Sequence, residues 1–322
     1  MSFRSSGWWA DILRSGRRSP AAPRSARRRA ADPRRGPIAR HQRVLVTGAA
    51  GRIGRGVLDV LARESVAATA LVLEDPGDLR ADRVVVGDAR SPDVVAHAMD
   101  GADGVIHLAA IPTPIDDPPE VVFGTNTLST FTVLDAAGRA GVRRAVIASS
   151  QAASGIPFAA HAQHPVHVPV DNDTPDQAAD PYALSKRVDE LTADAMARRY
   201  GMAVVALRFP FVGGMDERLR DHADDVARDP ALGARSLWAY LETRDAAEAA
   251  WLALGCPAHG AVVIHVAAPE TLVPVPTLDL LRRYHPSTPV RRPIEGRAVP
   301  YDLTAAEQVL GFRARHHVVG TP

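Results

Sequence analysis

A tyrosine and a lysine four residues apart, Tyr182 and Lys186, are the side chains of this sequence best suited to acid–base chemistry. At that spacing both side chains lie on one face of a helix. A tyrosine hydroxyl ordinarily has a pKa near 10 and is a poor base at neutral pH, but a neighbouring ammonium stabilises the phenolate and lowers this pKa. Such a tyrosine could remove the hydroxyl proton of an alcohol while hydride leaves the same carbon for a nicotinamide. The pair therefore predicts a centre for hydride transfer.

The composition singles out this lysine. The chain has 322 residues and 38 basic residues, and Lys186 is the only lysine among them. An arginine is larger and presents a planar fork of donors, so it does not easily replace a compact ammonium at a buried site. The retention of lysine at this position favours a catalytic pair over the alternative, a chance pairing on an ordinary helix.

A third group should bind the reacting oxygen, as a donor of the oxyanion type. Ser149 and Ser150 stand at the end of a predicted strand over 142–149, and we expect the hydroxyl of Ser150 to fill this role. The alternative is a serine pair that only caps the strand end.

A glycine-rich turn, with Gly48, Gly51 and Gly54 three residues apart, separates an apolar run over 43–47 from a run with helical spacing over 53–63. In this context the three glycines allow a tight turn, a close approach of a pyrophosphate, and close packing of the helix. The start of the helix also presents free N–H groups to the phosphates. These groups belong to Arg52, Ile53 and Gly54. An ordinary strand–turn–helix junction is the alternative, but the flanking elements favour a dinucleotide site.

Carboxylates after the next two predicted strands indicate which dinucleotide is bound. Glu74 follows the strand over 68–73, where a carboxylate accepts hydrogen bonds from both ribose hydroxyls and repels a 2′-phosphate, so NAD is favoured over NADP. Asp88 and Ala89 follow the strand over 83–86, and Asp88 is placed to meet the adenine amino group. Small or apolar residues that leave room for the cofactor end the strand over 104–108: Leu108, Ala109 and Ala110. Solvated turn acids and plain strand ends are the alternatives.

The rest of the pattern alternates strands with helices, and its apolar runs are continuous, as is typical of parallel strands covered on both faces. Further helices are expected over 93–99, 118–140 and 181–200, and a sixth strand over 203–207. We therefore predict an α/β fold in which residues 42–208 form a doubly wound parallel sheet of the Rossmann type. After residue 208 short helices and one strand, over 262–266, mix with loops. This part, 209–322, is expected to be a smaller C-terminal substrate-binding subdomain, interleaved with the first.

The first 41 residues differ from the rest in charge. Arginines are dense there, whereas the whole chain has a net charge of only +1. We expect a disordered extension; a transit peptide and a start codon placed too far upstream are alternatives, and a nucleic-acid-binding arm is disfavoured because no aromatic pattern accompanies the arginines. The single cysteine, Cys256, fits a reducing compartment, and no apolar stretch is long enough to span a bilayer. A cytoplasmic protein without membrane contact is the expectation.

Together these residues resemble the extended short-chain dehydrogenase/reductases, the NAD-dependent epimerase/dehydratase family, over about residues 42–315. The landmarks that carry the resemblance are Thr47-Gly48-x-x-Gly51-x-x-Gly54, His107-Leu108-Ala109-Ala110, Ser149-Ser150 and Tyr182-x-x-x-Lys186. The resemblance implies that Asn126 supports the fourth strand beside the cofactor and that Phe209 lies at the nicotinamide end. It also implies that Tyr182 and Lys186 contact the cofactor.

Within the family the likeness is to short members such as the uronate dehydrogenases. It implies that Ser150 and Gln151 contact the substrate and that Arg235 grips a sugar carboxylate, although Gln151 and Ala152 stand where the uronate enzymes have asparagine and histidine. It also implies a homodimer through the helices over 118–140 and 180–200. Residues 155–180 form a histidine-rich insertion, either a surface loop or a substrate lid, and no metal site is expected there.

The function that these features predict is hydride transfer between NAD and the carbinol of a sugar, sugar acid or nucleotide sugar, by a dehydrogenase or an epimerase. A dehydratase is disfavoured because Gln151 and Ala152 replace the acidic pair that dehydration needs beside the serine. The alternative class is a non-catalytic, cofactor-sensing regulatory protein on the same fold. Such proteins commonly lose the tyrosine or the lysine, and both are present here.

Overall fold

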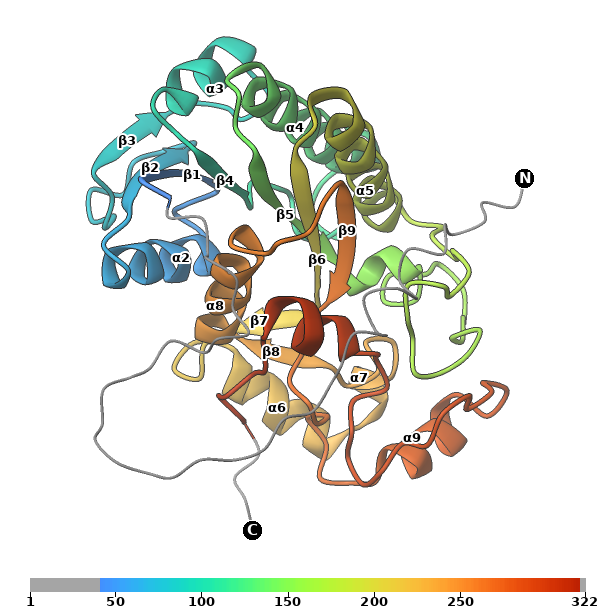
Figure 1. Cartoon of the computed structure of the whole chain (residues 1–322). Helices are drawn as coiled ribbons and strands as arrows, with labels where there is room; N and C mark the ends of the chain where they lie inside the picture. The colour runs from blue at the N-terminus through green and yellow to red at the C-terminus, as the bar shows by residue number, and fades with distance from the viewer. Residues whose placement is uncertain (1–40, 319–322) are drawn as a thin grey trace, which may run out of the picture. The chain divides into compact units, whose positions relative to one another are not determined.

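A seven-stranded parallel sheet forms the centre of the computed structural model, which describes residues 41–318 (Figure 1). The strand order is β3-β2-β1-β4-β5-β6-β9, so the chain starts in the middle, at β1, builds outward to β3, and returns to β4 on the other side. The strands are β1 (Arg43–Thr47), β2 (Ala67–Val72), β3 (Arg83–Val86), β4 (Gly104–His107), β5 (Arg144–Ser150), β6 (Ala203–Phe209) and β9 (Ala261–His265). The reversal between β1 and β4 is the switch point at which such sheets bind ligands.

Helices cover both faces of this sheet (Figure 1). Two of them, α2 (Arg52–Arg63) and α8 (Thr243–Leu254), pack on the face that carries Val44 and Val46. Three others, α3 (Pro92–Met99), α4 (Pro119–Arg139) and α5 (Pro181–Tyr200), pack on the face that carries Leu45. Successive side chains of a strand point to opposite faces. Consecutive residues in the middle of a covered strand are therefore apolar, which explains the continuous runs in the sequence.

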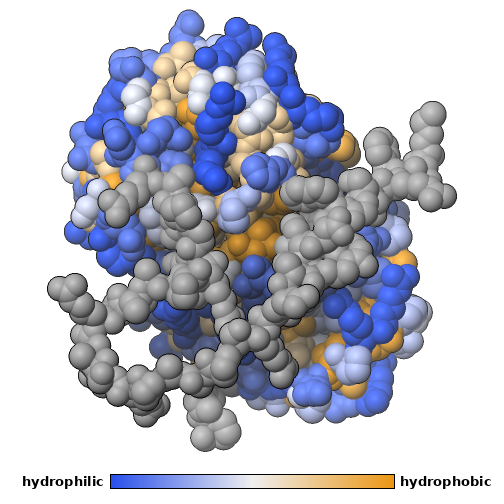
Figure 2. Space-filling view, viewed as in Figure 1, coloured by the Kyte–Doolittle hydropathy of each residue, from blue (hydrophilic) through white to orange (hydrophobic). Residues whose placement is uncertain are grey.

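A second apolar cluster lies beyond the carboxyl ends of β6 and β9 and gathers the remaining short elements. They are β7 (Phe211–Gly213), β8 (Tyr240–Glu242), α6 (Leu219–Arg228), α7 (Ala231–Ala234) and α9 (Thr277–Tyr284). Strands β7 and β8 pair in parallel as a separate two-stranded sheet. On the side in view, hydrophilic residues dominate the described surface, and hydrophobic ones gather near its centre (Figure 2).

The predicted doubly wound parallel sheet is confirmed, and every predicted strand and helix of residues 42–208 is present within two residues of its expected bounds. The strand expected over 262–266 is also present, but it pairs with β6 and extends the main sheet. The predicted disordered extension falls almost entirely on residues 1–40, outside the described residues. Among residues 41–318, no helix combines the length and the apolar character that a membrane span requires.

Candidate active site

A pocket of about 600 Å³ opens at the carboxyl ends of the central strands. It brings together most of the residues that the sequence singled out: Gly48, Gly51, Arg52, Ile53, Gly54, Leu108, Ala110, Ser150, Gln151, Tyr182, Lys186, Phe209 and Arg235. The other predicted contacts do not line it: Glu74, Asp88, Ala89, Ala109 and Asn126. Segments that are far apart in the sequence thus meet around one cavity.

The glycine turn forms one end of this pocket and leaves no room for side chains. Gly48 has a φ of +64°, and a Cβ added there would lie 2.7 Å from the backbone nitrogen of Ala109. A Cβ on Gly54 would lie 2.3 Å from the carbonyl oxygen of Gly48. Helix α2 begins directly after Gly51 with no side chain capping its first N–H groups. A tight turn with uncapped N–H groups facing a cavity fits a pyrophosphate.

The two carboxylates expected at the adenosine end are differently placed. Glu74 is exposed and lies two residues beyond β2, next to the glycine turn because β2 pairs with β1. The Asp88 carboxylate accepts hydrogen bonds from the side chain of Arg90, at 2.6 Å from Nη2 and 2.9 Å from Nε, and this guanidinium lowers the pKa of Asp88. Contacts of Glu74 with a ribose, and of Asp88 with an adenine, stay predictions.

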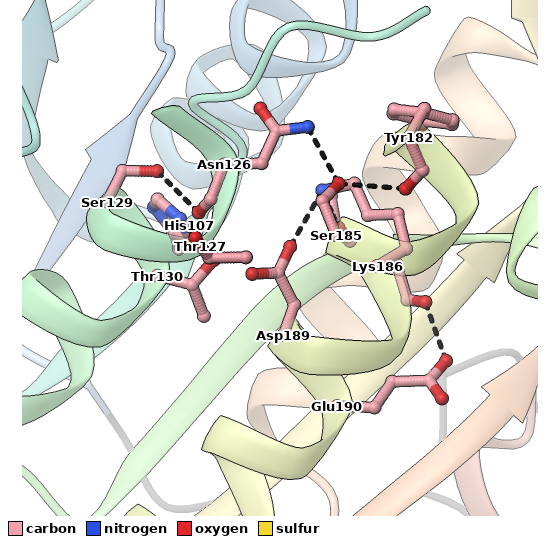
Figure 3. Close-up of polar contacts among 12 residues, drawn as sticks. His107, Asn126, Thr127, Ser129, Thr130, Tyr182, Ser185, Lys186, Asp189 and Glu190 are labelled. Carbon is pink, nitrogen blue, oxygen red and sulfur yellow. Dashed lines mark hydrogen bonds and ion pairs between the residues drawn. The ribbon is translucent and has the colours of Figure 1, made fainter. Parts of the chain in front are cut away.

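Helix α5 presents Tyr182 and Lys186 to the pocket (Figure 3). The helix starts where Asp180 accepts a hydrogen bond from the N–H of Ala183 at 2.8 Å, with proline at the first helical position, so its first turn is fixed. Tyr182 packs edge-on against Phe158, with 5.7 Å between the ring centroids. The Lys186 Nζ lies 5.9 Å from the centroid of the Tyr182 ring.

The Lys186 ammonium is almost fully enclosed. It donates to the carbonyl oxygen of Ala148 at 2.9 Å and to Asp189 Oδ2 at 3.1 Å. Burial alone would lower the pKa of Lys186, but Asp189, together with Tyr182 and Glu190, outweighs this effect and the pKa is raised. The ammonium is therefore charged at neutral pH.

Ser150 and Gln151 line the pocket where β5 ends. The Ser150 Oγ accepts a hydrogen bond from the N–H of Ala152 at 3.0 Å and is 3.5 Å from the carbonyl oxygen of Phe209. The Gln151 side chain is buried, and its Nε2 has no hydrogen-bond partner. An unsatisfied buried donor is costly, so a site that faces a cavity in this way suits a ligand oxygen.

Behind the pocket, a buried histidine and an asparagine fix the end of β4. His107 lies 2.7 Å from Thr47 Oγ1 through Nδ1 and 3.2 Å from Thr130 Oγ1 through Nε2. Burial, helped by the Lys186 charge, lowers the pKa of His107 to about 3, so this ring is neutral. Asn126 holds the backbone of Ile111 through two hydrogen bonds, of 2.8 Å and 3.1 Å. This support of the segment after β4 is the role expected of Asn126.

The far end of the pocket is cationic. Arg235 ends α7, and its Nη1 donates to the carbonyl oxygen of Ala159 at 2.8 Å. Two pocket residues that the sequence did not suggest join it, Arg218 and His222. Arg218 stacks over the ring of Phe211 at 4.3 Å. The residue pattern did not point to Arg218 and His222. An apolar stripe at helical spacing, Leu219, Ala223 and Val226, marks α6 as a helix but does not show which of its polar side chains reach a pocket.

The histidine-rich insertion forms contacts with the C-terminal part. The Nδ1 atoms of His164 and His285 are 2.9 Å apart, and His167 lies 3.3 Å from Asp171. In the described range, no three histidine, cysteine, aspartate or glutamate side chains gather in a way that could hold a metal ion.

The doubly wound sheet, the glycine turn and the enclosed Tyr182–Lys186 pair define a dinucleotide-dependent oxidoreductase of the extended short-chain type. The chain belongs to the NAD-dependent epimerase/dehydratase family, whose model matches residues 44–267. The predictions of family, enzyme class and NAD as cofactor are confirmed by this match and by the relatives described next.

Three relatives illustrate the range of the family. The chain is 31% identical to an L-arabinose 1-dehydrogenase (NAD(P)(+)) of Haloferax volcanii, over 61% of this chain and 76% of that protein. It is 29% identical to a uronate dehydrogenase of Pseudomonas syringae pv. tomato, over 52% of this chain but only 58% of that enzyme. It is 30% identical to a 3-diazoavenalumate denitrifying reductase of a Streptomyces species, over 86% of this chain and 90% of the reductase.

A solved structure supports the fold. A short-chain dehydrogenase/reductase superfamily protein from Agrobacterium tumefaciens, with bound NAD, superposes with a TM-score of 0.65. The match covers 86% of this chain and 93% of the other at 23% identity. At that level of identity the likeness establishes the shared architecture and leaves the substrate to be inferred from the site.

Proposed function

We propose that this enzyme oxidises or epimerises a carbinol carbon of a sugar, sugar acid or nucleotide sugar. The observation that carries the proposal is the enclosure of Tyr182 and Lys186 in the same pocket as the uncapped start of α2. When bound, NAD supplies the acceptor for the hydride. The non-catalytic sensor remains the alternative, and it is disfavoured because both members of the pair are present and buried.

Three side chains act on the substrate hydroxyl, each in a different way. Tyr182 takes the hydroxyl proton and returns it in the reverse direction. Lys186 holds a fixed positive charge beside the phenol of Tyr182 and keeps this phenol oriented. Ser150 donates to the reacting oxygen after turning its hydroxyl away from Phe209, a contact of 3.5 Å that costs little to break.

The substrate end of the pocket favours a polyhydroxylated, acidic molecule. Gln151 offers an unpartnered amide donor, and Arg235 retains most of its donor fork after the single bond to Ala159. An arginine fork suits a carboxylate or a phosphate. The names of the arabinose and uronate dehydrogenases place sugars among the substrates of relatives. We therefore assign residues 209–322, interleaved with the sheet, the role of a substrate-binding subdomain.

A homodimer through α4 and α5 is part of the proposal. Both helices leave large apolar side chains exposed at helical spacing. They are Val121, Leu128 and Phe131 on α4, and Leu184 and Leu191 on α5. Residues three or seven apart share a helix face, so these side chains form stripes that a second copy could cover.

A cytoplasmic location is proposed on narrower grounds. Cys256 is a free thiol and is buried. A free, enclosed thiol suits a reducing compartment.

The experiment that tests the function is turnover with NAD and a panel of neutral sugars, sugar acids and nucleotide sugars, for the wild type and Tyr182→Phe. We expect Tyr182→Phe to lower kcat by roughly 10²–10⁴-fold, the usual contribution of an acid–base group, while NAD binding is retained. Tyr200→Phe, at the other end of the same helix, is the matched control. NAD binding without any turnover that depends on Tyr182 would favour the sensor.

The same panel separates the two reactions. A dehydrogenase accumulates reduced cofactor in proportion to the sugar consumed. An epimerase inverts the sugar without net reduction of NAD.

A further inference from the structure

A buried ion pair stands behind the proposed catalytic tyrosine (Figure 3). The side chains of Lys186 and Asp189 are 4% and 1% exposed, and Nζ and Oδ2 are 3.1 Å apart. The two residues are one helical turn apart on α5, so the helix itself sets their approach. The sequence pattern that singled out Tyr182 and Lys186 did not include Asp189.

No other described carboxylate pairs with this ammonium. Glu190, the next residue of α5, is held by Arg208 at 2.7 Å and by Ser149 at 2.7 Å. On β4, His107 carries no charge, because burial lowers its pKa to about 3. Helix α4 presents the neutral Thr130 to this histidine. Tyr182 and Glu190 also act on Lys186 and favour its charged form.

Burying the carboxylate of Asp189 at this position is unfavourable for folding. Its Oδ1 is buried and has no hydrogen-bond partner. Burial raises the pKa of this carboxyl, although the ammonium of Lys186 and the hydroxyl of Thr130 both act to lower it. Taking two charges out of water usually costs more than an apolar pair of the same volume would. A buried pair of this kind therefore contributes little to stability. A role in function would explain why the two charged residues are present.

We propose that Asp189 is a positioning residue, whose carboxylate holds the Lys186 ammonium against the Ala148 carbonyl and beside Tyr182. This inference rests on the proposed function of Tyr182. An ammonium has three N–H donors, and two of them are taken by Ala148 and Asp189. No hydrogen bond of the third donor is found among the described residues, and Lys186 lines the same pocket as Tyr182.

Replacing Asp189 by asparagine keeps the shape of the side chain and removes its charge. A buried ammonium without a counter-ion is disfavoured, so Lys186 loses its proton at a lower pH. A neutral lysine no longer stabilises the Tyr182 phenolate. Ionisation of Tyr182 should then require a higher pH.

The test follows Tyr182 ionisation directly in the full-length protein with NAD bound. The phenolate changes the ultraviolet absorbance, and subtracting the titration of Tyr182→Phe isolates the signal of this one tyrosine. We expect Asp189→Asn to move the pH midpoint of this signal upward by about one unit or more. Asp194→Asn, which removes an exposed carboxylate from the same helix, should leave the midpoint in place.

A second measurement asks whether the pair is coupled. Denaturant midpoints are compared for Lys186→Met, Asp189→Asn and the double variant. We expect the double variant to unfold at a higher denaturant concentration than Lys186→Met alone, because that single variant leaves a buried carboxylate without its partner.

A Tyr182 midpoint that is unchanged or lower in Asp189→Asn overturns the proposal, and so does additivity of the two substitutions in the denaturation series. Neither readout requires turnover. Failure of the proposed function would show separately, as the absence of any turnover that depends on Tyr182 in the wild type.

Discussion

Substitution of Gly54 by alanine should strongly weaken cofactor binding while the protein still folds. An added Cβ would lie 2.3 Å from the carbonyl oxygen of Gly48, and 2.7 Å and 2.8 Å from Cα and the carbonyl carbon of Ala49. All three atoms belong to the backbone of the turn, so no side chain can rotate away. Ordinary contacts of carbon atoms lie near 3.5 Å, and the turn must therefore move by roughly 1 Å.

The size of the effect follows from this displacement. Overpacking of a tight site costs about 1–3 kcal/mol of stability, partly offset by the gain of about 0.5–1 kcal/mol when alanine replaces glycine within a helix. Hydrogen bonds to a charged group contribute about 1.5–3 kcal/mol each. Misplacing two N–H donors of the turn should thus weaken NAD binding by about 10²-fold or more.

Isothermal titration of NAD into Gly54→Ala measures this loss, and thermal unfolding measures the stability. Gly56→Ala is the matched control on the same helix, because its Cβ would meet the Cβ of Ala247 at 3.0 Å, on the side that faces α8. We expect the control to lose some stability and no affinity. A folded Gly54→Ala protein that binds NAD as the wild type does would refute the assignment of the turn to the pyrophosphate.

Three further outcomes are expected. His107 has a folded pKa of about 3 against an ordinary value of 6.5, so its contribution to stability is complete above pH 6.5 and is lost as the pH falls toward 3. The loss is about 2 kcal/mol between pH 6.5 and 5, and urea unfolding at stepped pH should show it in the wild type but not in His107→Asn. Leu191→Glu should halve the mass measured by light scattering, and an unchanged mass would exclude a dimer through α5. Arg235→Met should raise KM for acidic sugars at least roughly tenfold, the equivalent of about 1.4 kcal/mol, and leave KM for neutral sugars unchanged.

The sheet and its covering helices could be predicted because burial decides which of their positions are apolar. The middle of a strand such as 43–47 is apolar at consecutive positions, since both faces of the sheet are covered. Capping residues marked the ends of the long helix α5, which starts at Pro181 after the cap Asp180 and ends before Gly201, whose φ is +65°. Residues close together in the sequence determine these features, so they can be predicted from a single sequence.

The substrate end could not be predicted in the same way. Strands β7 and β8 have three residues each, and α7 has four, which is too short for any period to appear. Arg218 and His222 reach the pocket because both side chains pack against Phe211 of β7. The strand β9 was foreseen, but its partner was not, since pairing between β6 and β9 joins residues about sixty positions apart. The residue pattern within a strand does not show which distant strand it pairs with.

Two neighbouring carboxylates of α5 take different cations, and the contrast explains the solitary lysine. Glu190 meets Arg208, whose planar fork reaches both of its oxygens, Nε to Oε1 at 2.7 Å and Nη2 to Oε2 at 2.9 Å. The two hydrogen bonds of this guanidinium connect β6 with α5. At Asp189 the cation must instead fit beside the Ala148 carbonyl in an enclosed site, which suits a compact ammonium better than a guanidinium with its donors fixed in one plane. This arginine-rich chain therefore has its lysine at a buried position where the cation meets a backbone carbonyl as well as its own counter-ion.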